Sequence, residues 1–215
     1  MKKSLFLLFG ISFLLSACGI KDEVIADTIV DVTNCIQTEI TKEANHFADD
    51  IFGNSSKETS QETTQETSQE TSLQEVTVIR VVDGDTIVVA INGTEEKVRM
   101  IGIDTPESVH SDSSKNTEYG IMASDYTKSI ITETVYLEYD EDKTDQYDRL
   151  LCYVWLCNDT SNIENMLNAR LLKDGYAFNK EYKPNIKYAE DFEEICNAAE
   201  INNSGLWEYE AFYKY

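Results

Sequence analysis

Four short segments of the chain carry side chains that suit phosphodiester chemistry. They read D-G-D-T from 83 to 86, R-M-I-G-I-D-T-P-E from 99 to 107, D-Q-Y-D-R from 145 to 149, and E-Y-K-P-N from 181 to 185. Each segment alone is typical of a turn or of the end of a strand, because Asp, Gly, Asn and Pro favour turns. Together, and in this order, they combine carboxylates, guanidinium groups and tyrosines.

The charged residues of these segments divide by the chemistry that they suit. Asp85 and Asp104 offer hard carboxylate oxygens, which are ligands for Ca²⁺ or Mg²⁺ rather than for Zn²⁺. Glu107 is a third acid, suited to act on a water molecule rather than on the metal. Arg99 and Arg149 can make fork-like contacts with a phosphodiester. These parts meet the needs of metal-assisted phosphoryl transfer to water.

The surrounding pattern predicts the elements that must position these residues. Strands are expected over 77–82, 86–91, 97–103, 134–139 and 150–156, and helices over 119–132, from 161 to Gly175, and over 186–201. Asn92-Gly93 is a strong hairpin signal, and Ser161 with Glu164 reads as a capping box. Five short strands with three helices predict a mainly β fold, a small closed barrel with packed helices rather than a parallel sheet.

The order of motifs resembles the staphylococcal nuclease (thermonuclease) family. The pattern runs DGDT, R-x4-DTPE, Y-x-R, YKPN and finally GLW, and the resemblance covers most of residues 75–207. It implies an OB-fold, a five-stranded barrel with three helices. It also implies an endonuclease that cuts DNA and RNA with Ca²⁺, breaks the 5′ P–O bond and leaves 3′-phosphate ends.

The resemblance further implies a role for each matching acid. Asp85 and Asp104 match the carboxylates that bind calcium, and Thr105 matches the residue that adds its backbone carbonyl. Glu107 matches the acid that orients or deprotonates the attacking water. The expected metal is therefore Ca²⁺, held at the turns that follow two of the strands.

The arginines and tyrosines match the substrate-binding side of the family site. Arg99 and Arg149 match the pair that holds the phosphate and stabilises its pentacoordinate transition state. Tyr147 and Tyr182 match tyrosines that line the nucleotide pocket. The expected partner is therefore a nucleic acid, bound by a nuclease domain that we expect to be monomeric.

The chain departs from the family pattern at several places around this pocket. Gln146 stands where a basic residue is frequent, and Asp148 stands where Gly is usual. The stretch 179–181 is one residue shorter, so the first of the two pocket tyrosines has no clear match. Acids are expected to crowd the approach to Arg149: Glu138, Asp140, Glu141, Asp142, Asp145 and Asp148. These changes put substrate affinity in doubt more than the metal site.

The N-terminal part predicts export and a lipid anchor. Residues 1–17 combine two lysines with a short apolar run and read as a lipoprotein signal peptide. The run ends in L-S-A followed by Cys18, which resembles a lipobox and implies lipidation of the Cys18 thiol. We therefore expect the protein on the cell membrane, with its catalytic domain on the extracytoplasmic side.

Two further segments are expected to separate the anchor from the globular domain. Apolar residues at helical spacing predict a stalk helix over 18–56, either a spacer or a helix that associates with itself or a partner. Four polar tetrads predict a disordered linker over 57–74. The nuclease-like domain is expected over 75–215.

Charge and cysteine content exclude some classes of protein. The net charge is −22, which argues against a protein that coats DNA through a basic surface. Five cysteines without a CxxC pair argue against a zinc framework, and the pairing of Cys152, Cys157 and Cys196 is left open. Two alternatives to an endonuclease remain: a nucleic-acid or protein-binding OB module that has lost catalysis, and a surface protein that functions through its stalk and polar repeat, with the nuclease domain incidental.

Overall fold

The structure is a computed structural model that describes residues 73–108, 117–210 and 212–214. The predictions for the signal peptide, Cys18, the stalk helix and nearly all of the linker lie outside the described residues. Within the described part, no helix is both long enough and apolar enough to cross a membrane.

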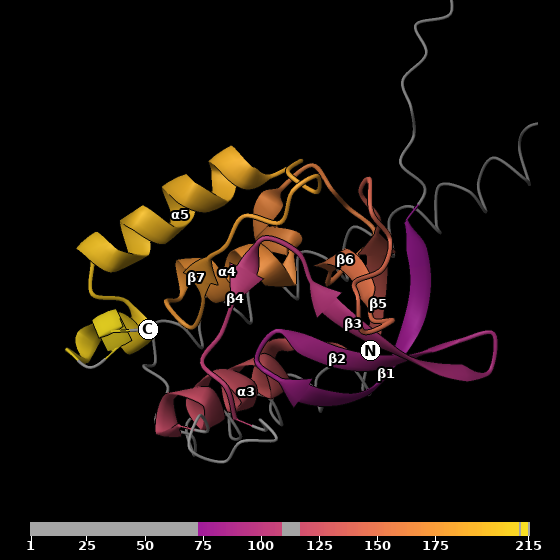
Figure 1. Ribbon diagram of the computed structural model, residues 1–215, viewed down its shortest axis with the longest axis horizontal. Helices are drawn as coiled ribbons and strands as arrows, with labels where there is room; N and C mark the ends of the chain where they lie inside the picture. The colour runs from indigo at the N-terminus through magenta and orange to yellow at the C-terminus, as the bar shows by residue number, and fades with distance from the viewer. Residues whose placement is uncertain (1–72, 109–116, 211, 215) are drawn as a thin grey trace, which may run out of the picture.

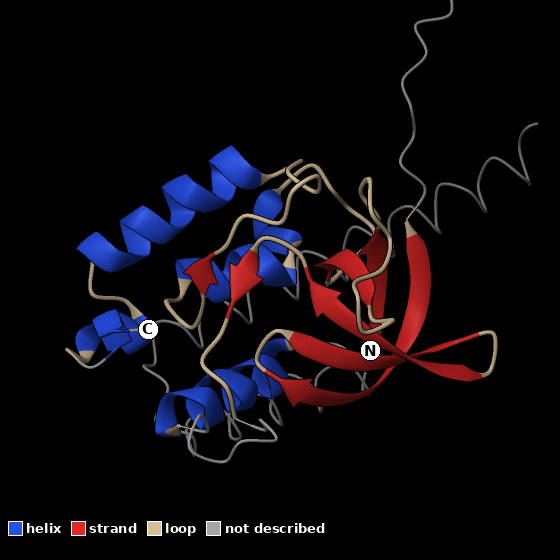
Figure 2. Ribbon diagram, in the orientation of Figure 1, coloured by secondary structure: helices blue, strands red, loops and turns tan. Residues whose placement is uncertain are grey.

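A closed barrel forms the centre of the molecule. The chain order of elements is β1 (Gln74–Asp83), β2 (Thr86–Ile91), β3 (Thr94–Met100), β4 (Ile103–Asp104), α3 (Glu118–Ile130), β5 (Thr134–Glu138), β6 (Leu150–Trp155), η2 (Ile163–Asn165), α4 (Leu167–Lys173), β7 (Phe178–Asn179), α5 (Ala189–Ile201), η3 (Gly205–Glu208) and η4 (Phe212–Lys214). The barrel order is β1-β2-β3-β6-β5. The five-stranded OB-type barrel with three α-helices in the described part is therefore confirmed (Figures 1 and 2).

The hairpin between β2 and β3 follows the sequence signal. Ile91 pairs with Thr94, which leaves Asn92 and Gly93 as a two-residue turn. Both turn residues have positive φ values, 51° and 83°. Such turns favour Asn-Gly because their backbone twist matches that of the strands. The turn fixes the register of β3, and this register places Arg99 opposite Thr86, beside the D-G-D-T segment.

The third strand was predicted to run to residue 103, and this is wrong. The strand ends at Met100, and the chain bends through Gly102, whose φ of 79° favours glycine. A side chain there would also collide with Phe192, because a Cβ atom would lie 2.5 Å from its ring. After the bend, β4 leaves the barrel and pairs with β7, a strand that the sequence pattern did not predict.

The predicted capping box at Ser161 is also wrong. The Asn162 side chain accepts the N–H of Glu164 and opens a short 3-10 helix, while the Ser161 hydroxyl donates to Asp159. Met166 then takes an extended conformation before α4 begins. The two N–H groups of the expected box are therefore satisfied by other residues: Asn162 accepts that of Glu164, and Asp159 accepts that of Ser161.

The helices pack around the barrel and its small second sheet. Figure 1 shows α5 above and α3 below on the left of the barrel, with α4 and the β4–β7 pair between these two helices. Trp155, Tyr126, Tyr153 and Phe192 are among the largest fully buried side chains. Burying such side chains supplies the main favourable free energy of the fold.

The cysteines of the barrel region differ in state. Cys157 is disulfide-bonded, whereas Cys152 and Cys196 carry free thiols. Cys152 occupies a fully buried position on β6. Burial raises the pKa of its thiol to about 12, so Cys152 acts as a small core residue.

Candidate active site

Two turns dock against each other at one end of the barrel. The backbone N–H of Thr105 donates to Asp85 Oδ2 at 2.9 Å. The Ser108 hydroxyl donates to Asp83 Oδ1 at 2.7 Å. The first aspartate of the D-G-D-T segment therefore holds the loop that follows β4, a structural role that the sequence did not reveal. Gly84 is required between them, because a Cβ atom there would lie 2.7 Å from Thr105 Oγ1.

Arg99 joins the two aspartates that the sequence singled out. One terminal nitrogen of its guanidinium lies 3.0 Å from Asp85 Oδ2 and 2.7 Å from Asp104 Oδ1. The other terminal nitrogen donates to the carbonyl oxygens of Met100 and Ile103, at 2.7 and 2.9 Å. The bend after β3 thus wraps around the arginine. Arg99 is buried, and Asp104 remains partly exposed.

The oxygen atoms at this point fit a hard divalent cation. The pKa of the Asp85 carboxyl lies above its ordinary value, because the effect of burial outweighs those of the Arg99 charge and the Thr105 N–H. Thr105 Oγ1 is buried and has no hydrogen-bond partner among the described residues. No group of three His, Cys, Asp or Glu side chains gathers in the described part. The available donors are therefore two carboxylates and the neutral oxygens of Thr105, a set that suits Ca²⁺ or Mg²⁺.

Lys180 is a site residue that sequence reasoning missed. Its Nζ lies 2.9 Å from Asp104 Oδ2, so Asp104 is paired with two cations. Lys180 follows β7, whose pairing with β4 brings it beside Asp104. The shortened stretch 179–181 was recognised in the sequence, but the pairing that makes Lys180 a neighbour of Asp104 was not.

Glu107 lies at the surface, on the loop held by Asp83. Its side chain is exposed, and its backbone carbonyl accepts the N–H of Thr117 at 3.0 Å. Thr117 caps α3. Gly120 in the first turn of α3 leaves room for this contact, because a Cβ atom there would lie 2.2 Å from the Glu107 oxygen. The N-terminus of α3 and the D-G-D-T turn therefore both hold the backbone of the loop at Glu107.

Arg149 lies on the neighbouring loop before β6 and is held by Asp145. Its Nε donates to Asp145 Oδ2 at 2.7 Å, and a terminal nitrogen lies at the same distance. Asp145 Oδ1 accepts the backbone N–H groups of Tyr147 and Arg149. Asp145, which was expected to repel phosphate near Arg149, instead orients the arginine.

Other acids of the crowded stretch also have structural partners. Glu138 is buried and accepts hydrogen bonds from Trp155 and Tyr188. Asp140 accepts the Tyr153 hydroxyl at 3.0 Å. The expectation that Glu138 crowds the approach to Arg149 is therefore wrong, because its charge is enclosed in a hydrogen-bonded cluster.

Asp148, which stands where glycine is usual in the family, occupies a turn position that asparagine and aspartate can also adopt. Its φ is 59°, in the left-handed region where Gly is favoured and Asp is tolerated. The backbone therefore keeps the turn despite the substitution. The side chain is exposed and brings one negative charge next to Arg149.

The two tyrosines flank the arginines. The Arg99 guanidinium carbon lies 5.4 Å from the centroid of the Tyr182 ring. The Arg149 guanidinium carbon lies 5.6 Å from that of Tyr147, whose side chain is 70% exposed. An exposed ring beside a cation is a surface on which a base can stack. The structure thus brings Tyr182 to the aspartate cluster and Tyr147 to Arg149.

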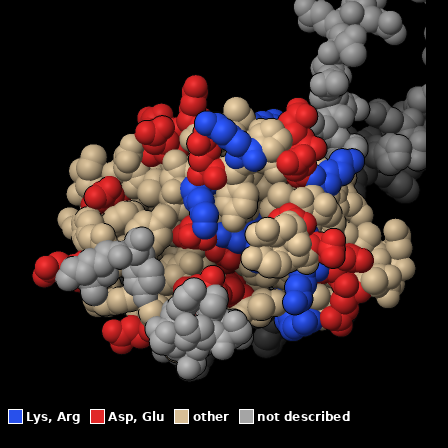
Figure 3. All heavy atoms as spheres, in the orientation of Figure 1, with Lys and Arg blue, Asp and Glu red and all other residues tan. Residues whose placement is uncertain are grey.

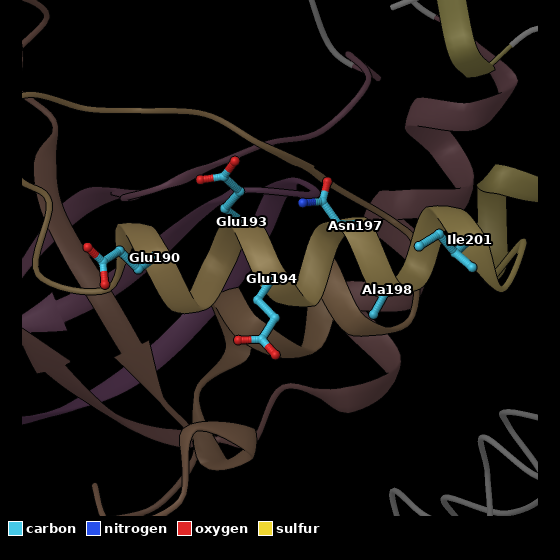
Figure 4. Close-up of a pocket in the computed structure, with 6 residues that line it drawn as sticks. All are labelled: Glu190, Glu193, Glu194, Asn197, Ala198 and Ile201. Atoms are coloured by element: carbon cyan, nitrogen blue, oxygen red, sulfur yellow. The ribbon is translucent and has the colours of Figure 1, made fainter.

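A separate surface depression of about 460 Å³ lies on α5, away from these residues. Figure 4 shows that all six residues along it come from this one helix, among them Glu190, Glu193 and Glu194. These three carboxylates would repel phosphate. We therefore place the chemistry at the barrel end and not in this depression.

A closed OB-type barrel whose turns carry two aspartates, an exposed glutamate and nearby arginines defines a nuclease-type hydrolase. Residues 97–209 match the family of staphylococcal nuclease homologues. The chain is 43% identical to the thermonuclease of Staphylococcus hyicus over 135 residues, which are 62% of this chain and 76% of that protein. It is 42% identical to the thermonuclease of Staphylococcus intermedius over 130 residues, 60% of this chain and 73% of that protein.

A third relative is more distant. Endonuclease YncB of Bacillus subtilis is 35% identical over 137 residues, 63% of this chain and 62% of that protein. The chain belongs to the staphylococcal nuclease family, and it is a nuclease. Its substrate class is nucleic acid, and nucleases of this family generally depend on a metal ion.

Proposed function

We propose that the protein is a calcium-dependent extracellular endonuclease that hydrolyses phosphodiester bonds in DNA and RNA and leaves 3′-phosphate ends. The observation that best supports this is the pairing of Asp85 with Asp104 across Arg99, next to the loop that carries Glu107. The candidate metal ligands are all oxygens, which suits a hard cation. Both carboxylates contact the same nitrogen of Arg99, so they already converge on one positive charge.

In the proposed reaction, each group of this chain has a distinct task. A divalent cation held by Asp85, Asp104 and the Thr105 carbonyl would supply positive charge for the developing phosphorane. Glu107 takes a proton from the water whose oxygen attacks phosphorus. The bond from phosphorus to the 5′ oxygen breaks, and this oxygen leaves with the electron pair and gains a proton from solvent. The products are a 3′-phosphate and a 5′-hydroxyl.

The two arginines have different tasks in the proposed reaction. Arg149 is held by Asp145 with its guanidinium over the Tyr147 ring and can bind a non-bridging oxygen. Arg99 is enclosed by carbonyl and carboxylate oxygens, so its first task is to keep the two aspartates together. Exposed Tyr147 and half-buried Tyr182 supply rings for the bases on either side.

The test compares cleavage with Ca²⁺ and with excess chelator, on single-stranded DNA and on RNA of defined length. We expect chelator to abolish cleavage, and end-labelling to detect 3′-phosphates. Glu107→Gln and Arg149→Ala should each lower kcat by about 100-fold or more. Glu118→Gln, which removes an exposed acid from the first turn of α3, is the matched control and should leave kcat unchanged. Equal cleavage in chelator, or near-normal turnover of Glu107→Gln, would contradict the proposal. Binding without cleavage would favour a non-catalytic OB module.

We further propose that the nuclease domain is monomeric and is anchored to the outer side of the membrane by lipid on Cys18. The support is the lipobox-like sequence before Cys18. Cells grown with radiolabelled palmitate should label the wild-type protein and leave Cys18→Ser unlabelled. Added protease should digest the domain on intact cells. A labelled Cys18→Ser protein, or a domain protected from protease, would refute the anchor or the location.

A further inference from the structure

Lys180 is held rigidly at its backbone but not at its side chain. Its N–H donates to the carbonyl of Gly102 at 3.0 Å, directly after the pairing of β7 with β4. The side chain is 48% exposed, and Nζ lies 2.9 Å from Asp104 Oδ2. The same Nζ lies 5.9 Å from the centroid of the Tyr182 ring. A flexible ammonium group therefore stands at the rim of the site, between a proposed metal ligand and a proposed base-stacking ring.

The two basic side chains that pair with Asp104, Arg99 and Lys180, differ in how easily they can dissociate from it. Arg99 also contacts Asp85 and two backbone carbonyl oxygens, and its side chain is only 5% exposed. Among the described residues, Lys180 has one ion pair, at its exposed end, and such pairs contribute little free energy. If Asp104 binds another cation, its ion pair with Lys180 therefore breaks before its ion pair with Arg99.

The surface around the site is acidic, so a mobile lysine side chain there would help to bind a phosphate. Residues 75–215 carry 13 basic and 28 acidic side chains, and Gln146 replaces a frequent basic residue near Arg149. Figure 3 shows the sparse blue groups on this face set among red ones, with blue next to red over the central β4–β7 region. A phosphate that approaches Arg99 and Asp104 meets Lys180 as an exposed positive group.

We propose that Lys180 is a phosphate-binding residue whose ammonium pairs with Asp104 until a divalent cation takes that carboxylate, and then contacts a substrate phosphate. The proposal rests on the proposed metal dependence. Once Asp104 binds a dication, the pair with Lys180 is replaced by repulsion between two positive charges. The nearest incoming anion is the nucleic-acid backbone, and the flexible side chain can reach it without movement of the β7 backbone.

This exchange predicts opposite effects of one substitution on two ligands. Lys180→Met removes a competitor for Asp104 and should tighten Ca²⁺ binding about two- to fivefold, measured by calorimetry on the full-length protein without nucleic acid. Lys183→Met is the matched control, because Lys183 is exposed on the same segment but pairs with Glu181. It should leave the Ca²⁺ affinity unchanged, and Lys180→Arg should remain close to the wild type.

The second measurement is nucleic-acid binding with Ca²⁺ present. Fluorescence anisotropy of a labelled single-stranded oligonucleotide is followed over a range of salt in the Glu107→Gln background, with its integrity checked on a gel. Lys180→Met should weaken binding and reduce the slope of log K against log[salt] by about 0.7, the contribution of one phosphate contact on a single strand. Lys183→Met should leave the slope unchanged, and Lys180→Arg should restore it.

The outcomes separate this proposal from the proposed function. A Lys180→Met protein that matches Lys183→Met in Ca²⁺ affinity, or that binds Ca²⁺ more weakly, overturns the exchange. A rise in Ca²⁺ affinity with an unchanged salt slope overturns the phosphate contact. If the wild-type protein binds no Ca²⁺ and cleaves equally in chelator, the metal dependence itself fails, whatever Lys180→Met does.

Discussion

At the scale of single residues, the orientation of Arg149 depends on one carboxylate. Asp145 accepts two backbone N–H groups on one oxygen and the guanidinium on the other. Partial burial raises the pKa of Asp145, but these N–H groups and the Arg149 charge outweigh it, so the pKa lies below its ordinary value of 3.8. The folded state therefore stabilises the ionised form.

Asp145→Asn should disturb both stability and turnover. We expect the free energy of unfolding at pH 7 to fall by about 1–3 kcal/mol, because hydrogen bonds to a charged group are lost, and kcat to fall because Arg149 is no longer oriented. A lowered pKa stabilises the fold above pH 3.8 and loses this effect as pH falls through the folded-state pKa. Urea unfolding from pH 7 down to pH 3 should show the difference from wild type shrinking below about pH 4.

Asp148→Asn is the matched control for this experiment. It removes the same charge beside Arg149 but keeps a residue type that tolerates the positive φ of 59°. We expect little change in stability and a lower KM, because one repelling charge is lost. If both variants lose the same stability at pH 7, Asp145 acts only through its charge and the bonding argument is refuted.

At the scale of elements, the site lies where the chain leaves the barrel after β3 and forms β4, which pairs with β7. The bend at 101–102 sends β4 away from the barrel, and this places Asp104 against Arg99 and Lys180. The bend is fixed from below by buried Asn168 of α4. Its amide donates to the Ile101 carbonyl at 2.8 Å and accepts the Val154 N–H at 2.9 Å.

Asn168→Ala should therefore loosen the site as well as the fold. Two buried backbone groups would lose their partners, which costs about 2–5 kcal/mol in the free energy of unfolding. We also expect lower kcat at a temperature where the variant is folded. The control is Asn162→Ala, an exposed cap of a short 3-10 helix, for which about 1 kcal/mol or less is expected. If urea unfolding gives the same loss of unfolding free energy for both variants, the two hydrogen bonds of Asn168 do not hold the bend.

At the scale of the whole molecule, acidity and catalysis coexist because positive charge is local. In the described part, Arg99 and Lys180 both pair with Asp104, and the β3–β6 register sets Arg99 opposite Leu151, two residues after Arg149. Acids elsewhere lie at the surface, as on α5, or are enclosed, as Glu138 is. Few phosphates can therefore be neutralised at once, and binding should be weak and transient.

The salt dependence of binding checks this arrangement. Two or three phosphate contacts give a slope of log K against log[salt] of about −1.4 to −2.1 on single-stranded substrate. The slope should be measured with the Glu107→Gln protein and saturating Ca²⁺. A slope steeper than about −5 would mean an extended basic track, and would contradict the local charge that the structure describes.

Local patterns predicted most of the elements because they are decided by neighbours in the chain. The Asn92-Gly93 turn and the β2 range of 86–91 depend on backbone preferences and alternation, and both are confirmed. The breaks were harder to predict. The bend at Gly102 packs against Phe192 of α5, a residue far away in the sequence, and the η2 cap depends on which of two adjacent polar residues accepts the N–H.

By itself, the sequence determined the barrel class and the family, because these follow from the strand and turn pattern and from the order of the motifs, and it predicted the acids and arginines of the site. Only the tertiary structure decided how they are connected: Lys180 reaches Asp104 through the β4–β7 pair, Asp145 orients Arg149, and Glu138 is enclosed. These contacts are set by packing between distant segments. The effect of a charge depends on its distance and burial, which no spacing along the chain specifies.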